Sequence, residues 1–361
     1  MNTTTMNTTT ILMEMNTEWN FTKTTTINVI TTQSSTTTTT LTLTQILTGI
    51  AQIILGFIII FGNTLTVAAI RKFRRLKTET GILIASLAIA DLFMGFTMWL
   101  HACYEFVPQM GWSNFMCSFK YFTFFLSSAA SIYNLILIAV DRYIAITQPL
   151  RYHQWITYRT VPIMMIITWM WCVMIAMVPF FWYNTRSNPK QLCTFFHHIP
   201  KYFLACVLGT QHFICMIAMI VLYGQILIVA LKQQRQIQAE SITTPANNNP
   251  TNASKSKPKI SFSKQLKTAK LFAVVIGLFL FCWTPVFVLL FLHASNVYSS
   301  RSIAYTIAPL LGVVNSCVNP IIYSWKNKDY KLAFKKLLCL SKETIGLDES
   351  LFSEHIKTIS S

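Results

Sequence analysis

Charged residues are scarce in this chain. Asp, Glu, Lys and Arg make up only 11% of its 361 residues, whereas soluble domains carry roughly a quarter. Hydrophobic residues reach 53% and the mean hydropathy is +0.47. This composition excludes an ordinary soluble domain and indicates a membrane protein.

The motifs of catalysis are also missing. The sequence has no Gly-rich loop to cradle phosphate and no cluster of His and Cys with the spacing of metal ligands. His197 and His198 are adjacent in a predicted loop, which is poor ligand geometry without a third partner. We therefore expect no enzyme, and the only candidate cofactor is a sodium ion, discussed below.

Nine cysteines in a chain of this length do not make a disulfide scaffold, and most of them fall in apolar runs, where Cys is small packing material. We also expect no cleavable signal peptide. The first 44 residues, rich in Thr and Asn, predict a disordered extracellular tail. It contains three Asn-x-Ser/Thr sequons as candidate glycosylation sites, at Asn2, Asn7 and Asn20.

Seven apolar runs have the length that a membrane helix needs, which is about 20 residues. The predicted fold class is therefore an all-α membrane protein, a bundle of seven transmembrane helices over 45–325. The runs cover about 45–70, 81–107, 115–140, 160–183, 202–231, 269–293 and 303–325.

Basic residues set the predicted orientation, and the net charge is +17. Lys and Arg cluster in 71–80, 141–159, 232–268 and after 325, and positive loops stay inside the cell. We expect a plasma-membrane protein with its N-terminus extracellular and its C-terminus cytoplasmic. The basic helix ends would face membrane lipids or an acidic partner surface, and nucleic acid is not expected as a partner.

Two cytoplasmic segments have their own patterns. The polar stretch within 232–268 predicts a disordered third cytoplasmic loop. Residues 326–340 place Tyr330, Phe334 and Leu337 on one face and lysines on the other, which predicts a short amphipathic eighth helix on the membrane surface, before a cytoplasmic tail over 341–361. Cys339 is a candidate for palmitoylation, and an unmodified Cys is an equal alternative.

Asp91 is the most informative polar residue within the seven apolar runs. A carboxylate at membrane depth is costly and needs a cation or a hydrogen-bond cage. Asn63, Ser131, Asn315 and Asn319 offer oxygen atoms that suit a hard cation such as Na⁺. A protonated Asp91 bonded within the bundle is the alternative.

Each run carries its own set of motifs, in a fixed order: Asn63, "LAIAD" with Asp91, Cys117 and "DRY" at 141–143 in the third run, Trp169, Tyr223, "CWTP" at 282–285 and "NPIIY" at 319–323. This set resembles the rhodopsin-like (class A) G-protein-coupled receptors, over about residues 45–340. The stretches "DRYIAITQPLRY" and "NSCVNPIIYSWKN" are most similar to the amine-receptor branch.

The resemblance implies an extracellular small-molecule or lipid-like ligand and a heterotrimeric G protein as partners. It implies a disulfide between Cys117 and Cys193. It also implies an allosteric sodium site at Asp91, Ser131, Asn315 and Asn319. The residues that it implies for activation and G-protein contact are Asp141, Arg142, Tyr143, Tyr223, Gln265, Phe279, Pro285, Pro320 and Tyr323.

The chain departs from amine receptors at Phe124, where they carry an Asp that binds the ammonium group. The expected pocket is apolar and aromatic, which favours a neutral, aromatic or lipid-like ligand over a small cation. Its expected lining is Phe124, Phe125, Ser128, Phe195, His212, Trp283, Phe287, Leu290 and Pro309. His101 and Glu105 are the nearest ionisable side chains, and hydration at the headgroup level is favoured for both.

A second departure is Gln265, where many relatives carry a Glu that pairs with Arg142. Glutamine can hydrogen-bond Arg142 but cannot form a charge pair. We therefore expect a weak clamp between helices and some signalling without ligand.

Two other functions remain open from the sequence. A receptor-like protein that only modulates partner receptors would also lack the amine anchor, although intact "DRY" and "NPIIY" argue against it. A transporter would show paired halves with repeated broken helices, and the seven runs carry unlike motifs.

Overall fold

The computed structural model describes residues 27–28, 40–181, 193, 209–243, 253–295 and 304–340. The sequons at Asn2, Asn7 and Asn20, the tail after 340 and Phe195 lie outside these residues. For Gln265, on helix α9, the backbone alone is described.

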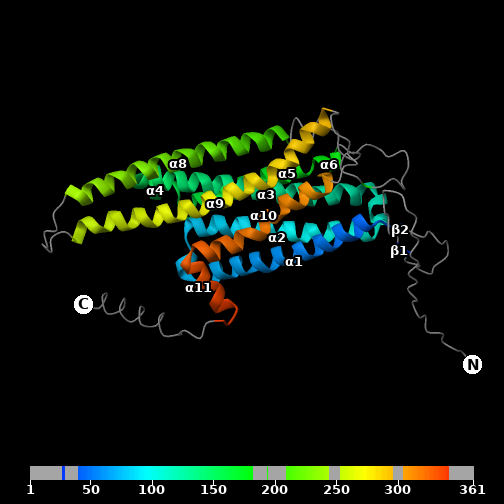
Figure 1. The fold of residues 1–361 in the computed structure, drawn as a ribbon, viewed down its shortest axis with the longest axis horizontal. Coiled ribbons are helices and arrows are strands. Elements are labelled where there is room, and N and C mark those ends of the chain that lie inside the picture. The colour runs from blue at the N-terminus through cyan, green and yellow to red at the C-terminus, as the bar shows by residue number, and fades with distance from the viewer. Residues whose placement is uncertain are drawn as a thin grey trace, which may run out of the picture.

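Seven helices in the described part of the chain are long and apolar enough to cross a membrane. Figure 1 shows them side by side along the long axis of the molecule. Their bounds are α1 Leu43–Lys72, α2 Glu79–Phe106, α3 Asn114–Thr147, α5 Thr160–Ala176 with its extension α6 Val178–Phe181, α8 Thr210–Thr243, α9 Ala253–Ala294 and α10 Ala304–Lys326.

The remaining elements are short. They are β1 Ile27–Asn28 and β2 Thr40–Leu41, paired antiparallel, the 3₁₀ helices η1 Arg74–Leu76 and η2 Pro108–Trp112, α4 Pro149–Trp155, and α11 Lys328–Leu337. The sequence prediction of an all-α bundle of seven transmembrane helices with a short amphipathic eighth helix is confirmed, and α11 is that eighth helix.

Local sequence explains where helices begin. Thr42 caps α1 as part of a capping box: its hydroxyl accepts from the Gln45 amide at 3.3 Å, and its own amide donates to Gln45 Oε1 at 2.9 Å. Thr78 caps α2 through the Gly81 amide at 3.0 Å. Asn327 separates α10 from α11 by accepting from the Asp329 amide at 2.9 Å, so the chain turns here.

The amphipathic pattern of α11 is visible in its packing. Tyr330 is buried against Tyr323 of α10, with ring centroids 5.6 Å apart, and Phe334 packs edge-on against Tyr330. Lys335 and Lys336 lie in the last turn of the helix. The helix therefore buries its aromatic face against the bundle while its basic residues follow at its end.

The helices differ in how much of their surface the bundle covers. In the most apolar window of α2, 67% of residues are buried, and the value is 61% for α3 but 17% for α5. Exposed large apolar side chains such as Phe57, Phe61, Ile167 and Met170 lie on α1 and α5. In a membrane protein these surfaces face lipid, so α2 and α3 form the centre on which the polar residues converge.

The third loop differs from its predicted form. We expected the polar stretch 239–259 of this loop to be disordered, but α8 continues to Thr243 and α9 begins at Ala253, so helix covers both ends of that stretch. Both helices extend beyond their apolar spans, and Figure 1 shows their joined ends projecting past the rest of the bundle. The residues that follow Leu231 include Lys, Gln, Arg and Ala, which propagate a helix well once the apolar span has nucleated it.

Glycines let α1 and α2 approach closely. A Cβ at Gly95 would lie 2.6 Å from Ile60 Cγ1 and 3.3 Å from the Gly56 carbonyl oxygen, and a Cβ at Gly56 would collide with Trp99. In lipid the hydrophobic effect does not drive helices together. Small residues at a helix crossing allow the close van der Waals packing that holds the helices together instead. Trp99 also donates from Nε1 to the Ile53 carbonyl oxygen at 3.3 Å, which binds the two helices together.

We predict that Gly95→Ala lowers the free energy of unfolding by about 1–3 kcal/mol, because the added methyl group forces α1 and α2 apart. The matched control is Gly224→Ala on α8, where nothing lies within 4 Å of the added Cβ. That change should be neutral or stabilise by up to about 1 kcal/mol. Thermal unfolding of the purified protein in nanodiscs measures both, and equal effects would contradict the packing argument.

Candidate functional site

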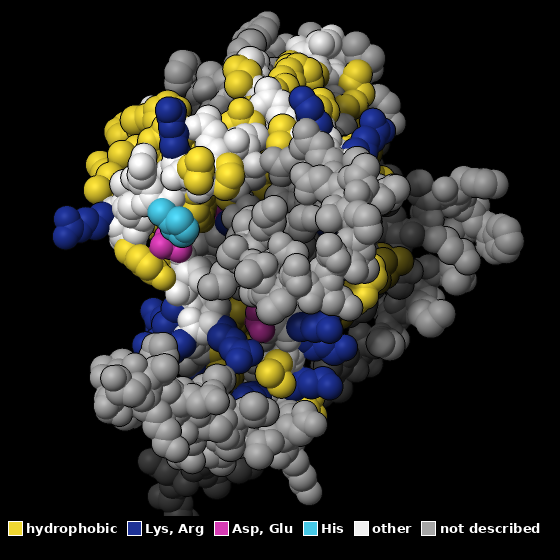
Figure 2. Space-filling model, turned by 90° about the vertical axis from the view of Figure 1, so that its left-hand side faces the viewer, with side chains coloured by type: hydrophobic (Ala, Val, Ile, Leu, Met, Phe, Trp, Pro, Cys, Tyr) yellow, Lys and Arg dark blue, Asp and Glu magenta, His cyan; other side chains and the backbone are white. Residues whose placement is uncertain are grey.

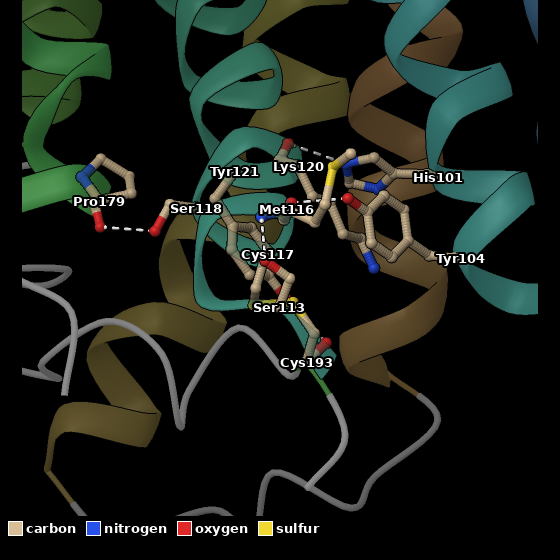
Figure 3. Close-up of a disulfide and its surroundings, with 10 residues drawn as sticks. All are labelled: His101, Tyr104, Ser113, Met116, Cys117, Ser118, Lys120, Tyr121, Pro179 and Cys193. Carbon is tan, nitrogen blue, oxygen red and sulfur yellow. Dashed lines mark hydrogen bonds between the residues drawn. A yellow bond between two sulfur atoms is a disulfide. The ribbon is translucent and has the colours of Figure 1, made fainter. Parts of the chain in front are cut away.

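A disulfide marks one end of the bundle. Cys117 of α3 is bonded to Cys193, with a Cα–Cα distance of 5.7 Å, as the resemblance implied (Figure 3). Tyr104 of α2 donates to the Met116 carbonyl oxygen at 2.6 Å, and Ser118 of α3 donates to the Pro179 carbonyl oxygen of α6 at 3.0 Å. These bonds fix α2, α3 and α6 together, and we call this end the disulfide end.

The first cavity lies below the disulfide end and encloses about 80 Å³. Predicted pocket residues that line it are Phe124, Phe125, Ser128, His212, Trp283, Phe287 and Leu290. Lining residues that were not predicted for the pocket include Tyr133, Ile175, Gln211, Cys215 and Val286. Pro309 lines a second, neighbouring cavity instead.

Aromatic rings dominate the first cavity. Trp283 is 3% exposed, and its ring centroid lies 6.1 Å from that of Phe279 and 6.3 Å from that of Phe124. His212 stacks on Phe287 with centroids 3.4 Å apart, and neither of its ring nitrogens has a hydrogen-bond partner among the described residues. A mostly apolar chamber, whose polar side chains are Ser128, Tyr133, Gln211 and His212, suits an aromatic group that makes few hydrogen bonds.

Cys215 lies eight residues before Tyr223, where the resemblance to the rhodopsin-like family implies a helix-bending proline. It is 7% exposed and lines the cavity from within α8, which is helical from Thr210 onward. A cysteine keeps the backbone amide that proline lacks.

The buried carboxylate of Asp91 lies at the centre of the bundle and is 0% exposed. It accepts hydrogen bonds from Ser316 Oγ at 2.6 Å and Asn319 Nδ2 at 2.8 Å, both on α10. Asn63 of α1 donates to the Ser316 carbonyl oxygen at 3.1 Å, so three helices meet here. The structure thus brings Asp91 and Asn319 together as predicted, and adds Ser316, which the sequence analysis did not assign to the site.

Several buried side-chain oxygens on α3 and α10 are of the kind that fits a hard cation. Ser131 is 2% exposed and Asn315 is 1% exposed. Ser131 Oγ, Asn319 Oδ1 and Asn134 Oδ1 have no hydrogen-bond partner among the described residues. Carboxylate, hydroxyl and amide oxygens are what Na⁺ prefers, whereas no group of three His, Cys, Asp or Glu occurs in the described part of the chain. The donor set therefore fits sodium and does not fit a transition metal.

At the opposite end, which we call the basic end, Arg142 is held in a buried network. Its Nε donates to Asp141 Oδ2 at 2.9 Å, and its terminal nitrogen bonds both Asp141 and the Thr80 hydroxyl. Thr80 donates to Asp141 Oδ2 at 2.9 Å, and Tyr152 of α4 donates to Asp141 Oδ1 at 2.8 Å. Asp141 is 1% exposed and Arg142 is 6% exposed, so this is a desolvated pair.

Tyr152 and Thr80 were not assigned a role from the sequence. Burial, and then the negative charge of Asp141, raise the pKa of Tyr152 above its usual value, so its phenol stays protonated and donates. Tyr152 lies 11 residues after Asp141 and Thr80 lies 61 before it. Eleven residues of a continuous helix would separate two side chains by about 16 Å along its axis, and Thr80, Asp141 and Tyr152 lie on three different helices, so only the fold could join them.

The tyrosines and prolines predicted for activation are not among the hydrogen-bond partners of this network. Tyr223 and Tyr323 are buried at their hydroxyl groups, which have no hydrogen-bond partner among the described residues. Tyr143 and Tyr223 pack against a small cluster around Ile146 and Ile226. Pro320 lies inside α10, and Pro285 lies inside α9.

The bundle has an aromatic cavity at one end and a buried arginine network at the other. This is the organisation of a seven-helix membrane receptor. The sequence model of the family described as "7 transmembrane receptor (rhodopsin family)" matches residues 62–323, well over half of the chain. The chain therefore belongs to the rhodopsin family of seven-transmembrane receptors.

Curated relatives agree with this family. The alpha-1A adrenergic receptor of Rattus norvegicus is 28% identical over 329 residues, which cover 81% of this chain and 70% of the relative. The human protein of that name is 28% identical over 321 residues, covering 81% and 68%. That of Oryzias latipes is 28% identical over 310 residues, covering 79% and 66%. Membership in this family makes the chain a multi-pass receptor of the plasma membrane and implies a non-enzymatic role.

We predict that Na⁺ stabilises the purified protein through Asp91. At a concentration ten times the dissociation constant, sodium should add about 1.4 kcal/mol to the free energy of unfolding. Asp91→Asn should abolish this gain, because the ion loses its only charged ligand. Thermal unfolding in sodium chloride and in choline chloride of equal ionic strength measures the effect. Asp329→Asn is the matched control, and an unchanged sodium response in Asp91→Asn would refute the site.

Proposed function

We propose that this protein is a G-protein-coupled receptor that binds an extracellular small molecule at the disulfide end and activates a heterotrimeric G protein at the basic end. The observation that carries the proposal is the buried Arg142–Asp141 pair, which lies in the same bundle as the aromatic cavity over Trp283. Family membership supports receptor signalling in general. The G protein to which this receptor couples and the ligand that it binds are part of the proposal.

The proposed orientation has the N-terminus outside the cell. Lys and Arg side chains are spread over the basic end, with few acidic ones among them (Figure 2). They include the exposed residues Arg71, Lys72, Arg74, Arg75 and Lys77. Positive segments remain in the cytoplasm, and a disulfide such as Cys117–Cys193 forms in the oxidising space outside.

The first cavity supports a ligand with an aromatic or apolar body. Phe124 stands where an amine receptor would carry its ammonium-binding Asp, and it packs against Trp283 and against His101, whose ring centroid is 5.8 Å away. An ammonium group at this point would meet rings and no carboxylate. The proposed ligand is therefore not a simple amine bound by the usual contact.

Activation is proposed to run along α9. Trp283 lies between the cavity and Phe279, and Pro285 removes a backbone hydrogen bond one turn away, where the helix can hinge. A ligand that contacts Trp283 differently in two hinge positions shifts their populations. Outward movement of α9 would give Arg142, Tyr223 and Tyr323 access to the G protein.

The resting state is proposed to depend on the network at Asp141. The described residues contain one ion pair, Arg142–Asp141, which is made by adjacent residues of α3. Gln265 of α9 would replace the acid that many relatives use as a second restraint. Asp141, oriented by Thr80 and Tyr152, then holds Arg142 locally.

We predict that Tyr152→Phe raises ligand-independent signalling. Loss of one hydrogen bond to a buried carboxylate costs the resting state about 1.5 kcal/mol, which corresponds to roughly tenfold more active receptor when that state is rare. GDP–GTP exchange on purified G proteins, with the receptor in nanodiscs, measures this. Tyr158→Phe is the matched control, because the Tyr158 hydroxyl donates to the Lys77 carbonyl oxygen on an exposed surface. A lower rate in Tyr152→Phe would contradict the proposed restraint.

We predict the opposite change for Gln265→Glu. A carboxylate at this position of α9 can add a charge-assisted bond to Arg142, so ligand-independent exchange should fall by about fivefold or more. Gln45→Glu, at the disulfide end of α1, is the control and should leave exchange unaltered. Unchanged output in Gln265→Glu sinks the weak-clamp idea. A different outcome is that the wild-type protein promotes no nucleotide exchange on any G-protein subtype with any ligand. That result would favour the alternative function, a receptor-like protein that only modulates partner receptors.

A further inference from the structure

The second cavity near the disulfide end differs in chemistry from the first. It encloses about 210 Å³ and lies among α1, α2, α3, α9 and α10. Phe124, Val286 and Leu290 line both cavities and so form the boundary between them. The polar side chains of its wall are Gln52, His101, Glu105 and Lys120.

Lys120 supplies a positive charge to this cavity. The residue is 9% exposed, and its ammonium group lies 5.0 Å from the ring centroid of Tyr104 and 5.7 Å from that of Tyr121. The ammonium group makes no hydrogen bond or ion pair with any residue in the described ranges, whereas the Lys120 backbone carbonyl oxygen lies 3.4 Å from His101 Nε2 and accepts a hydrogen bond from the Thr123 hydroxyl at 2.9 Å. Figure 3 shows Lys120 beside His101 and Tyr104, close to the disulfide. Aromatic faces compensate a buried ammonium only in part, so Lys120 gains from an anion at this position.

Glu105 supplies a negative charge to the same cavity. It interacts electrostatically with Lys120, yet the two make no ion pair within 4.0 Å, since Arg142–Asp141 is the one ion pair among the described residues. The wall therefore presents two opposite charges that are held apart. Gln52 adds an acceptor, because its Oε1 is buried and has no hydrogen-bond partner in the described part of the chain.

The position of the charges follows from helix geometry. Lys120 lies four residues before Phe124, one turn nearer the disulfide end of α3, and residues at this spacing share a helix face. His101 and Glu105 have the same spacing on α2. The missing charge at Phe124 is thus replaced by a pair of charges one turn further out.

We infer that this receptor recognises a zwitterionic small molecule with an aromatic side chain, such as an aromatic amino acid. Its anionic group pairs with Lys120, its ammonium group pairs with Glu105 and Gln52, and its ring passes Phe124 toward Trp283. The inference rests on the proposed receptor function. It adds a charged head group to the aromatic body that the first cavity alone supports.

Ligands with a single charge fit this arrangement less well. A plain amine satisfies Glu105 and leaves Lys120 unpaired beside it, whereas a plain carboxylate satisfies Lys120 and is repelled by Glu105. A neutral ligand leaves both charges desolvated without partners, which is the least favourable case. Only a zwitterion matches both signs in one molecule.

The test uses four probes with one ring system: tryptophan, tryptamine, indole-3-propionate and 3-methylindole. Binding is read as thermal stabilisation of the full receptor in nanodiscs, which does not depend on G-protein coupling. Tryptophan should bind about tenfold or more tightly than either singly charged probe, and 3-methylindole should bind weakest.

Two variants separate the charges. Lys120→Met should weaken tryptophan and indole-3-propionate by about thirtyfold but leave tryptamine unaffected. Glu105→Gln should weaken tryptophan and tryptamine and leave indole-3-propionate unaffected. Lys120→Arg keeps the charge and should retain tryptophan binding. Lys328→Met, an exposed lysine of α11, is the matched control.

Three results would overturn the inference. These are tryptamine binding as tightly as tryptophan, variants that weaken all four probes equally, and no stabilisation by tryptophan, tyrosine or phenylalanine at millimolar concentration. Failure of the proposed function looks different, because tryptophan would then bind selectively but neither it nor the unliganded protein would promote nucleotide exchange.

Discussion

The hydrocarbon core of a bilayer contains no water, and each polar group placed there must find its partners within the bundle. Asp91 shows the consequence most directly. Its carboxylate is fully buried and is bonded by Ser316 and Asn319 of α10, while Asn63 of α1 binds the Ser316 backbone. The buried carboxyl group of Asp91 thereby joins α2 to α10, and Asn63 joins α1 to the same point of α10.

The same constraint organises both ends of the molecule. At the basic end, Arg142 and Asp141 neutralise each other, and Thr80 and Tyr152 complete the hydrogen bonds that the pair needs. At the disulfide end, Lys120 and Glu105 line one cavity but remain apart. A satisfied pair is suited to holding a resting state, whereas two separated charges are suited to receiving a ligand. The difference in pairing therefore parallels the proposed division between signalling end and binding end.

Between these ends, the aromatic groups form the mechanical connection that we propose. His212, Phe287, Trp283 and Phe279 form one aromatic cluster at the first cavity, in which the His212 ring contacts the other three. Dense packing of rigid rings transmits a displacement because the core does not deform continuously. Phe124 lines both the first cavity and the charged second one, so it lies where the two meet.

The sequence by itself determined the seven spans, the eighth helix and the residues at which polarity enters the membrane, because helix length and amphipathic periodicity are local properties. It also predicted that Asp91 and Asn319 belong together, and that Phe124 removes the amine anchor. Tertiary structure alone decided that Ser316 bonds Asp91, that Thr80 and Tyr152 orient Asp141, and that Lys120 shares a cavity with Glu105. These contacts join different helices, and their distances depend on how whole helices cross, which no local pattern in the chain encodes.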